Sequence, residues 1–265
     1  MSNHRVASTM ATIRLYHADP SYYSMIARLA LAIGDIPYES CRMDIHRDKA
    51  QLRPEYAAIN PHLTVPTLKV GDRTLADSRD ILTWVVRERP EAFILGELDA
   101  AILDAHYALS IENLTFGRTM LKFAPLRWFF PKLLARVCGD LRQRKVAHPE
   151  FADVYEAKIR QNEARIRFFK EGDLSGKVEA LRHQSRDLIK MIPTPVGDYL
   201  WGNHPSPSDV ILTVFLARLA MIGEWDLVAD RPDLVSWFGR MQETEAYAHS
   251  DIWTRFSLRR IFGSH

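Results

Sequence analysis

Cysteine is scarce in this chain, and that scarcity excludes two kinds of architecture. Cys41 and Cys138 are the only two cysteines in 265 residues, and they stand far apart, without C-x-x-C spacing. A disulfide framework or a zinc site is therefore not expected, and we predict no metal ligands. Such cysteine usage is typical of the reducing cytoplasm, which is the location that we predict.

Long apolar runs and a strong charge of either sign are also missing. The polar segment Met1–Ala11 lacks the apolar core of a signal peptide, and no run approaches the ~20 apolar residues of a membrane span. The longest apolar cluster, Phe123–Val137, is interrupted by prolines and basic residues. A net charge of +2 gives no general case for nucleic-acid binding. With 47% hydrophobic residues, the composition is that of an ordinary soluble globular protein.

The most informative stretch covers residues 60–81 and predicts a hairpin followed by a capped helix. Two β-rich runs, Thr64–Val70 and Arg73–Ala76, are joined by a Gly-Asp pair that suits a tight turn. Asp77 and Ser78 then precede an apolar-periodic run, as the start of a helix requires. The free backbone N–H groups at such a helix N-terminus are suited to binding an anion.

The residues before this hairpin predict the rest of an α/β layer. Thr12–Tyr16 and Pro37–Met43 have the patterns of strands, and Ser21–Ile33 between them has the spacing of an amphipathic helix. Asp48–Ile59 predicts a helix that Pro54 interrupts. This order indicates one parallel strand pair and one antiparallel hairpin, with helices packed on the sheet.

After residue 90 the strand signals nearly vanish and helical patterns take over. They cover Ala100–Leu121, Pro149–Glu171, Asp173–Met191, Val210–Ile222 and Pro232–Met241. The strongest is preceded by Ser206-Pro207-Ser208-Asp209, a capping box with Asp in the usual place of Glu, which we assign to folding. We therefore predict an α/β domain at about 12–89, a linker near 90–98 and an all-α domain at about 99–255.

Four features in this order resemble a glutathione S-transferase: the α/β half, the Val65-Pro66 strand entry, the acidic-Ser pair and the helical half with its S-x-x-D box. The resemblance extends from Thr12 to about Tyr247 and implies a thioredoxin-like domain that binds glutathione as co-substrate, followed by an all-α domain that forms the electrophile site. It also implies a cis bond before Pro66, pairing of the Val65 backbone with the cysteinyl part of glutathione, and a homodimer. The γ-glutamyl end is implied to bind at Asp77 and Ser78.

Two further features are similar to the branch that contains tetrachlorohydroquinone dehalogenase and the ganglioside-induced-differentiation-like proteins. They are the insert at roughly Leu121–Pro149, and the segment Leu216–Met221 followed by Arg231–Leu234. The branch's redox cysteine falls on Tyr23 in this chain. Because a mixed disulfide with the enzyme cannot form without a thiol at that position, we expect thiolate addition or substitution in preference to reductive dehalogenation.

The chemistry implied by the resemblance requires glutathione to be held as a thiolate, which is the nucleophilic form. A hydroxyl donor near the sulfur, helped by a helix N-terminus, lowers the pKa of the thiol. Alignment of Arg28–Leu31 with serine-type transferases places Ser21 at this position, with Tyr23 and Ser24 as the next candidates. The alternative for Ser21 is that it merely caps the first helix.

A second substrate is expected in an apolar cleft between the two halves. The candidates lie on the first helix of the helical half, although core packing is the alternative for each of them: Tyr107, Ile111, Leu114 and Phe116. The insert Phe123–Val137 is consistent with a lid over the cleft, a dimer contact or a membrane-surface segment, of which the last is not favoured. For Asp251–Phe262 we expect a helix packed onto the body.

The function predicted from these observations is that of a cytoplasmic, glutathione-dependent transferase in detoxification. Ser21 would stabilise the thiolate for attack on a small apolar or aromatic electrophile. Two alternatives remain. One is ether cleavage, isomerisation or dehalogenation at the same site, and the other is a non-catalytic protein of this fold that binds a partner or a membrane surface.

Overall fold

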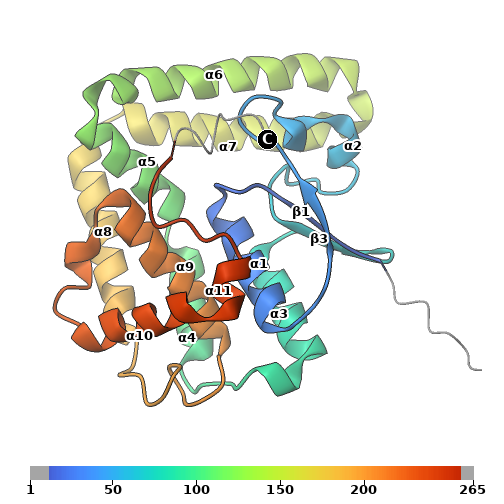
Figure 1. Cartoon of the computed structure of the whole chain (residues 1–265). Helices are drawn as coiled ribbons and strands as arrows, with labels where there is room; N and C mark the ends of the chain where they lie inside the picture. The colour runs from blue at the N-terminus through green and yellow to red at the C-terminus, as the bar shows by residue number, and fades with distance from the viewer. Residues whose placement is uncertain (1–11, 258–265) are drawn as a thin grey trace, which may run out of the picture.

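The computed structural model describes residues 12–257, which form a small α/β unit packed beside a larger helical body (Figure 1). The segment Met1–Ala11 and the end of Asp251–Phe262, both considered above, lie outside the described residues. Within the described part of the chain, no helix is both long enough and apolar enough to cross a membrane.

The α/β unit is built on a four-stranded mixed sheet with the strand order β2-β1-β3-β4. Strand β1 (Ile13–His17) pairs parallel to β2 (Glu39–Arg42) and antiparallel to β3 (Thr67–Val70). Strand β4 (Arg73–Leu75) completes the hairpin with β3. The predicted combination of one parallel pair and one antiparallel hairpin is confirmed.

Three short helical segments complete this unit. Helix α1 (Tyr22–Ile33) buries Met25, Ile26 and Leu29 in the core, the spacing that predicted it. The predicted helix at 48–59 is a 3-10 turn, η1 (Ala50–Leu52), followed by α2 (Pro54–Ala57). Pro54 begins α2 instead of breaking a longer helix, because proline at the first helical position gives up no hydrogen bond.

The remainder of the chain is helical. After α3 (Ser78–Glu88) and a short 3-10 turn, η2 (Pro90–Ala92), the long helices are α4 (Asp99–Ala108), α5 (Ile111–Lys122), α6 (Ala124–Ala147), α7 (Ala152–Lys170), α8 (Leu174–Met191) and α9 (Pro207–Ile222). Helices α10 (Pro232–Glu243) and α11 (Glu245–His249) follow. The 3-10 turn η3 (Pro149–Phe151) connects α6 to α7, and η4 (Trp225–Leu227) lies between α9 and α10.

Three sequence-based expectations about this half are wrong in detail. The single helix expected at 100–121 is two helices, because Leu109 turns extended and buries its side chain between them. The insert, for which no helix was expected, is the 24-residue helix α6. Residues 251–257 are not helical; they follow α11 as an irregular segment that buries Trp253.

Helix α9 lies at the centre of the structure and packs against both α1 and α4. Nearly all of its side chains are buried, which explains why its sequence is apolar on every side. Its start is the predicted capping box: Ser206 Oγ accepts from the backbone N–H of Asp209, and the Asp209 carboxylate accepts from the backbone N–H of Ser206 (2.8 Å).

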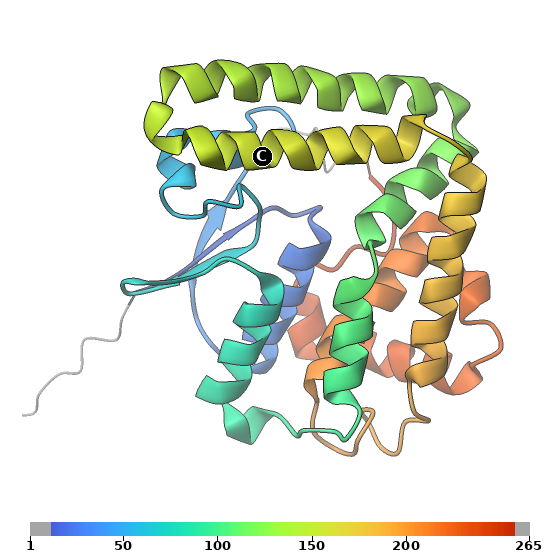
Figure 2. The ribbon, with the colours of Figure 1, turned by 180° about the vertical axis from the view of Figure 1, so that it is seen from behind.

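Helices α6 and α7 form a long antiparallel hairpin that runs along one edge of the molecule and crosses over α2 (Figures 1 and 2). A separate apolar cluster joins the hairpin to the α/β unit, and it consists of Leu52, Ala57, Leu63, Leu141, Tyr155 and Ile159. Lys49 pairs with Asp140 at the same contact. The insert is therefore anchored to the domain that carries the predicted glutathione site.

Candidate functional site

The first part of the site is the junction between β1 and α1. In the β1–β3 register, Tyr16 lies opposite Thr67, so the residues that follow β1 lie beside Val65 and Pro66. The peptide bond between Val65 and Pro66 is cis, as the resemblance implied. The loop before it is held by buried groups, since Tyr56 Oη (2.6 Å) and Asn60 Nδ2 (2.9 Å) both donate to the carbonyl of Thr64.

Ser21 caps helix α1 from this junction. Its hydroxyl oxygen accepts a hydrogen bond from the backbone N–H of Ser24 (3.3 Å), which leaves the hydroxyl proton available to a ligand. Ser24 itself is fully buried, and its Oγ accepts from the backbone N–H of Ala18 (3.3 Å). Ser24 therefore holds the turn together, whereas Ser21 is partly exposed and can contact a ligand.

Tyr23, the position of the branch's redox cysteine, is half-buried, with its ring stacked near Tyr107 (centroids 6.4 Å apart). Burial raises the pKa of Tyr23, with smaller contributions in the same direction from Glu112 and Asp77. Its hydroxyl is thus protonated at neutral pH and able to donate a hydrogen bond, but not to act as a base.

The second part of the site is the N-terminus of α3. Asp77 is the exposed N-cap, and its carboxylate accepts from the backbone N–H of Arg79 (2.7 Å). Ser78 is buried, and its Oγ lies 3.1 Å from the hydroxyl of Tyr107. Because Tyr107 also stacks on Tyr23, it connects the α3 N-terminus to the start of α1.

The four candidates for the second-substrate cleft divide into two pairs. Ile111 and Leu114 are 2% and 0% exposed in the main core, so the prediction that they line a cleft is wrong. Their helical spacing places them in the core, and core packing was the alternative interpretation for these residues. Tyr107 and Phe116 are partly exposed, and Phe116 stacks on Phe130 of α6 (4.4 Å).

Sequence reasoning missed a buried polar pair beside this junction. The hydroxyl of Tyr22 lies 2.7 Å from His106 Nε2, and both side chains are almost fully buried. Burial lowers the pKa of His106 to about 3, so its imidazole is neutral. The two residues are separated by 84 positions, and no local pattern connects them.

His17 also proves to be part of the framework. It is 4% exposed and lies between Arg28 Nη1, which donates to its Nδ1 (3.1 Å), and Ser40 Oγ, to which its Nε2 donates (2.7 Å). Burial and the charge of Arg28 lower the pKa of His17 to about 4. Arg28 further donates to the carbonyls of Ala18 and Ser250, and so ties the junction to the end of the helical body.

Basic groups reach the same junction from the helical body. Arg218 of α9 is almost fully buried, with Nη2 3.4 Å from the carbonyl of Pro20 and its guanidinium 5.2 Å from the Tyr22 ring centroid. Lys158 of α7 donates to the carbonyl of His62 (3.4 Å), three residues before Val65. Helix α7 therefore contacts the loop that leads to Val65.

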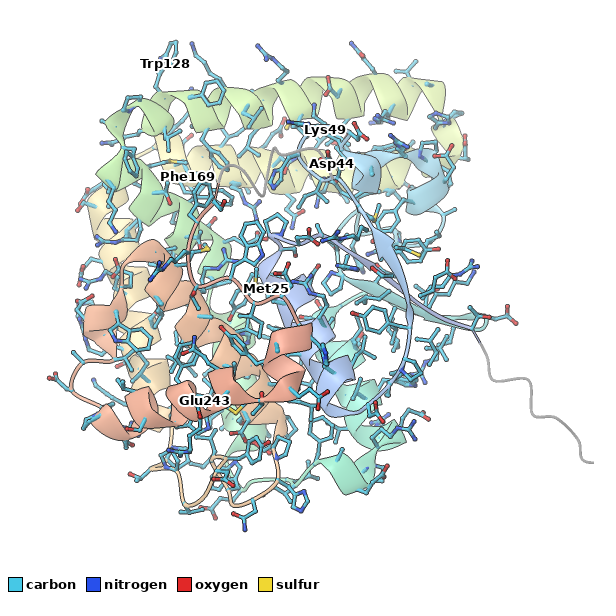
Figure 3. All side chains as sticks on the ribbon, in the orientation of Figure 1. Met25, Asp44, Lys49, Trp128, Phe169 and Glu243 are labelled. Carbon is cyan, nitrogen blue, oxygen red and sulfur yellow. The ribbon has the colours of Figure 1, made fainter. Side chains whose placement is uncertain are left out.

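The outer face of α6 is different in character. Trp128 projects from it away from the body, whereas Lys49 lies beneath the hairpin (Figure 3). Trp128, Phe129 and Phe123 are 69%, 54% and 61% exposed. Trp128 also lines a shallow hollow of about 340 Å³ between α6 and the end of α7.

Comparison with known proteins identifies relatives along most of the chain. Residues 15–93 match the family described as glutathione S-transferase, N-terminal domain. Tetrachloro-p-hydroquinone reductive dehalogenase of Sphingobium chlorophenolicum is 25% identical over 254 residues, covering 90% of this chain and 95% of the relative. Glutathione S-transferase TCHQD of Arabidopsis thaliana is 24% identical over 256 residues, covering 89% and 88%.

Solved structures of the same architecture cover the chain equally well. Glutathione transferase F7 from Populus trichocarpa superposes with a TM-score of 0.61 at 17% identity, covering 92% of this chain and all of that one. A glutathione transferase family member from Pseudomonas fluorescens, solved with two glutathione molecules bound, gives 0.62 at 13% identity, covering 93% and 95%. The predicted fold class, a thioredoxin-like domain followed by an all-α domain, is confirmed.

Proposed function

We propose that this chain, which belongs to the glutathione S-transferase superfamily near its tetrachlorohydroquinone dehalogenase branch, binds glutathione and uses its thiolate to attack a small aromatic electrophile. The observation that supports the proposal is that three groups lie around the junction between β1 and α1. These are the hydroxyl of Ser21 at the start of α1, the cis bond before Pro66, and Ser78 at the start of α3.

Glutathione fits this junction through its backbone and its charged end. The free N–H and C=O of Val65 would pair with the cysteinyl residue, in the manner of an added strand. The γ-glutamyl carboxylate would lie at the N-terminus of α3, where the N-terminal N–H groups and the helix dipole favour an anion. Asp77 would then accept from the γ-glutamyl ammonium group, because it is the exposed carboxylate at that end.

The reaction follows from the position of the sulfur beside Ser21. A hydrogen bond from the Ser21 hydroxyl favours the thiolate over the thiol and thereby lowers the pKa of the glutathione sulfhydryl. The sulfur then forms a bond to the electrophilic carbon, and the leaving group departs with the bonding electron pair. Reductive removal of a halogen would need a second thiol, and Tyr23 offers none.

The test is the substitution Ser21→Ala. We expect turnover of 1-chloro-2,4-dinitrobenzene to fall at least ~30-fold, since a positioned proton donor typically contributes ~10²-fold or more. We also expect the pKa of bound glutathione, followed by thiolate absorbance, to rise by about one unit or more. Retention on glutathione resin should survive, because the tripeptide's other contacts remain.

A capping control separates chemistry from folding. Ser21→Asp keeps a side-chain acceptor for the N–H of Ser24 and so preserves the cap of α1, but a carboxylate repels a thiolate. We expect its thermal stability to be close to that of wild type and its turnover to be as low as that of Ser21→Ala. Full activity in Ser21→Ala, with loss in Tyr23→Phe, would assign the activating hydroxyl to Tyr23 instead.

A second candidate function is peripheral binding of the outer face of α6 to an anionic membrane surface. The exposed aromatic residues of this face are accompanied by Arg127, Lys132 and Arg136, and no acidic residue occurs between positions 123 and 139. Lys132 Nζ lies over the Trp128 ring. Aromatic side chains at the interface with basic neighbours suit anionic headgroups. If this face instead contacted the same face of a second copy of the chain, the basic residues of the two copies would be brought together and would repel each other.

Vesicle sedimentation tests this second function. We expect the chain to sediment with vesicles of phosphatidylserine and phosphatidylcholine but not with phosphatidylcholine alone. The double variant Trp128→Ser, Phe129→Ser should lower the bound fraction at least ~5-fold, since it removes most of the apolar area that would insert. The control is Val196→Ser, which removes an equally exposed apolar side chain elsewhere. Equal sedimentation with both vesicle types would contradict the proposal.

A further inference from the structure

Three basic side chains of the helical body share one acidic neighbour, Glu112 at the start of α5. Arg218 comes from α9, and Lys158 and Arg165 come from α7. Arg218 and Arg165 also interact electrostatically with the hydroxyl of Tyr23. Glu112 interacts electrostatically with all three cations. It also forms a direct ion pair with Arg165.

Arg218 is the most deeply placed of the three. It is 7% exposed, and its polar contact is the carbonyl of Pro20 (3.4 Å), at the turn that carries Ser21. Its guanidinium faces the Tyr22 ring, and among residues 12–257 no carboxylate forms an ion pair with it. Burial without such a partner lowers the pKa of Arg218, which nevertheless stays charged at neutral pH.

Lys158 of α7 is less deeply placed than Arg218 and is partly exposed. Its ammonium donates to the carbonyl of His62 (3.4 Å), and it too lacks a carboxylate within ion-pair distance in the described part of the chain. Arg165 lies seven residues further along α7, which is two helical turns and therefore the same face. Burial, reinforced by the charge of Arg165, lowers the pKa of Lys158 to about 8.

The charges of this cluster do not balance. Glu112, the carboxylate that all three cations share, is already paired with Arg165, and the other carboxylate that acts on Tyr23, Asp77, caps α3. Three cations therefore exceed two carboxylates. Holding an unpaired cation such as Arg218 away from water is costly, so this arrangement favours a bound anion. The partly exposed rings of Tyr23 and Tyr107 stack near each other, and Tyr23 contacts the Tyr22 ring on which Arg218 lies. A ligand that is both flat and anionic would satisfy both features.

We propose that the second substrate is an aromatic electrophile that carries a carboxylate, held by Lys158 and Arg218 while its ring lies against the tyrosines. This inference rests on the proposed function and names the substrate class for the same site. In the reaction, the sulfur–carbon bond forms, the carbon–halogen bond breaks, and halide leaves with the bonding pair. The carboxylate takes no part in bond making and serves only to position the ring.

The test compares 4-chloro-3,5-dinitrobenzoate with the neutral 4-chloro-3,5-dinitrobenzamide, each normalised to its uncatalysed reaction with glutathione. For wild type we expect KM for the benzoate to be about tenfold lower than KM for the amide. Lys158→Met and Arg218→Met should each raise the ratio of KM for the benzoate to KM for the amide about tenfold, which removes the wild-type preference. Lys158→Arg should largely restore the preference, because it keeps the charge.

Arg160→Met is the matched control, since Arg160 lies on the same helix but is exposed and directed toward Glu156. It should leave both KM values unchanged. Equal KM values for the two substrates in wild type would overturn the proposal while leaving the proposed function intact. Equal losses for both substrates in Lys158→Met would also overturn it.

Binding of the two glutathione conjugates, measured by calorimetry, supplies a readout that does not need turnover. We expect the conjugate of the benzoate to bind at least ~10-fold more tightly than that of the amide, and Arg218→Met to abolish the difference. If neither substrate reacts but this preference is present, the proposed catalysis fails and the anion site stands. Equal affinity for the two conjugates would refute the anion site.

Discussion

Replacing Asp209 by alanine is expected to lower the free energy of unfolding by at least about 5 kcal/mol. The carboxylate is fully buried and accepts four hydrogen bonds: from the backbone N–H groups of Leu200 (3.0 Å) and Ser206 (2.8 Å), from Ser206 Oγ (2.8 Å) and from Trp237 Nε1 (3.0 Å). Each buried donor that loses its acceptor costs about 1–2 kcal/mol, and a lost cap contributes about 1 more. The substitution leaves donors from three segments of the chain without an acceptor.

The matched control is Asp80→Ala. Asp80 occupies the third position of α3, as Asp209 does in α9, but its side chain is exposed. We expect its loss to change stability by no more than about 0.5 kcal/mol. Both variants are measured by urea unfolding, followed by tryptophan fluorescence. A similar small effect in both would show that the buried network around Asp209 adds nothing beyond ordinary helix-start chemistry.

The α9 start also shows which parts of the fold are predictable from sequence. A capping box, an N-terminal proline and a continuous apolar run all lie within a few residues of one another, so the local pattern determines the local structure. The same holds for the β3–β4 hairpin and for the caps at Ser21 and Asp77. What the pattern leaves out is the partner: Trp237 and Leu200 reach Asp209 only after the chain has folded.

Helix α6 shows the opposite case. Pro125 and Pro131 interrupt its apolar cluster, and proline inside a helix normally breaks it. In the structure Pro125 stands in the first turn, where it is tolerated, and Pro131 is buried within a helix that continues past it. The packing of α6 against α7 stabilises this helix, and that contact involves residues distant in sequence. No local rule predicts such a contact.

Some residues of the candidate site could likewise be predicted from local sequence patterns, and others could not. Ser21, Pro66, Asp77 and Ser78 lie at strand ends and helix starts, where spacing and residue type are informative. Arg218 and Lys158 lie within helical patterns and resemble ordinary members of a solvated face. The burial of Arg218 beside the β1–α1 junction and the contact of Lys158 with His62 depend on how α9 and α7 pack against the α/β unit, which the sequence pattern does not specify.

Acidification is expected to destabilise the fold between about pH 6 and 4.5, before most carboxylates titrate. His106 and His17 are neutral and buried, and burial lowers their pKa values to about 3 and about 4. In the unfolded chain both have a pKa near ~6.5, so the unfolded state binds protons first as the pH falls. Stability is therefore present above ~6.5 and is lost on the way down, by up to ~1.4 kcal/mol per pH unit for each histidine.

Asp209 opposes this trend over part of the range. Burial raises its pKa to about 6, so below that pH the folded state binds a proton that the unfolded carboxyl does not yet bind. This contribution increases stability as the pH falls from about 6 to 4. His106 and His17 against Asp209 leave a net loss of about 1.4 kcal/mol per pH unit, or about 2 kcal/mol between pH 6 and 4.5. Burial also lowers the pKa of His46, which adds to this loss.

Removal of one buried histidine should reduce this slope. His106→Gln retains a side-chain partner for the hydroxyl of Tyr22 but does not titrate. We expect the urea-unfolding free energy of this variant to decline between pH 6 and 4.5 less steeply than that of wild type, by about 1.4 kcal/mol per pH unit, whatever its stability at pH 7. His183→Gln is the control, because that side chain is 66% exposed on α8 and its change should leave the wild-type slope in place. A slope in His106→Gln as steep as that of wild type would show that the buried Tyr22–His106 pair is not the source of acid sensitivity.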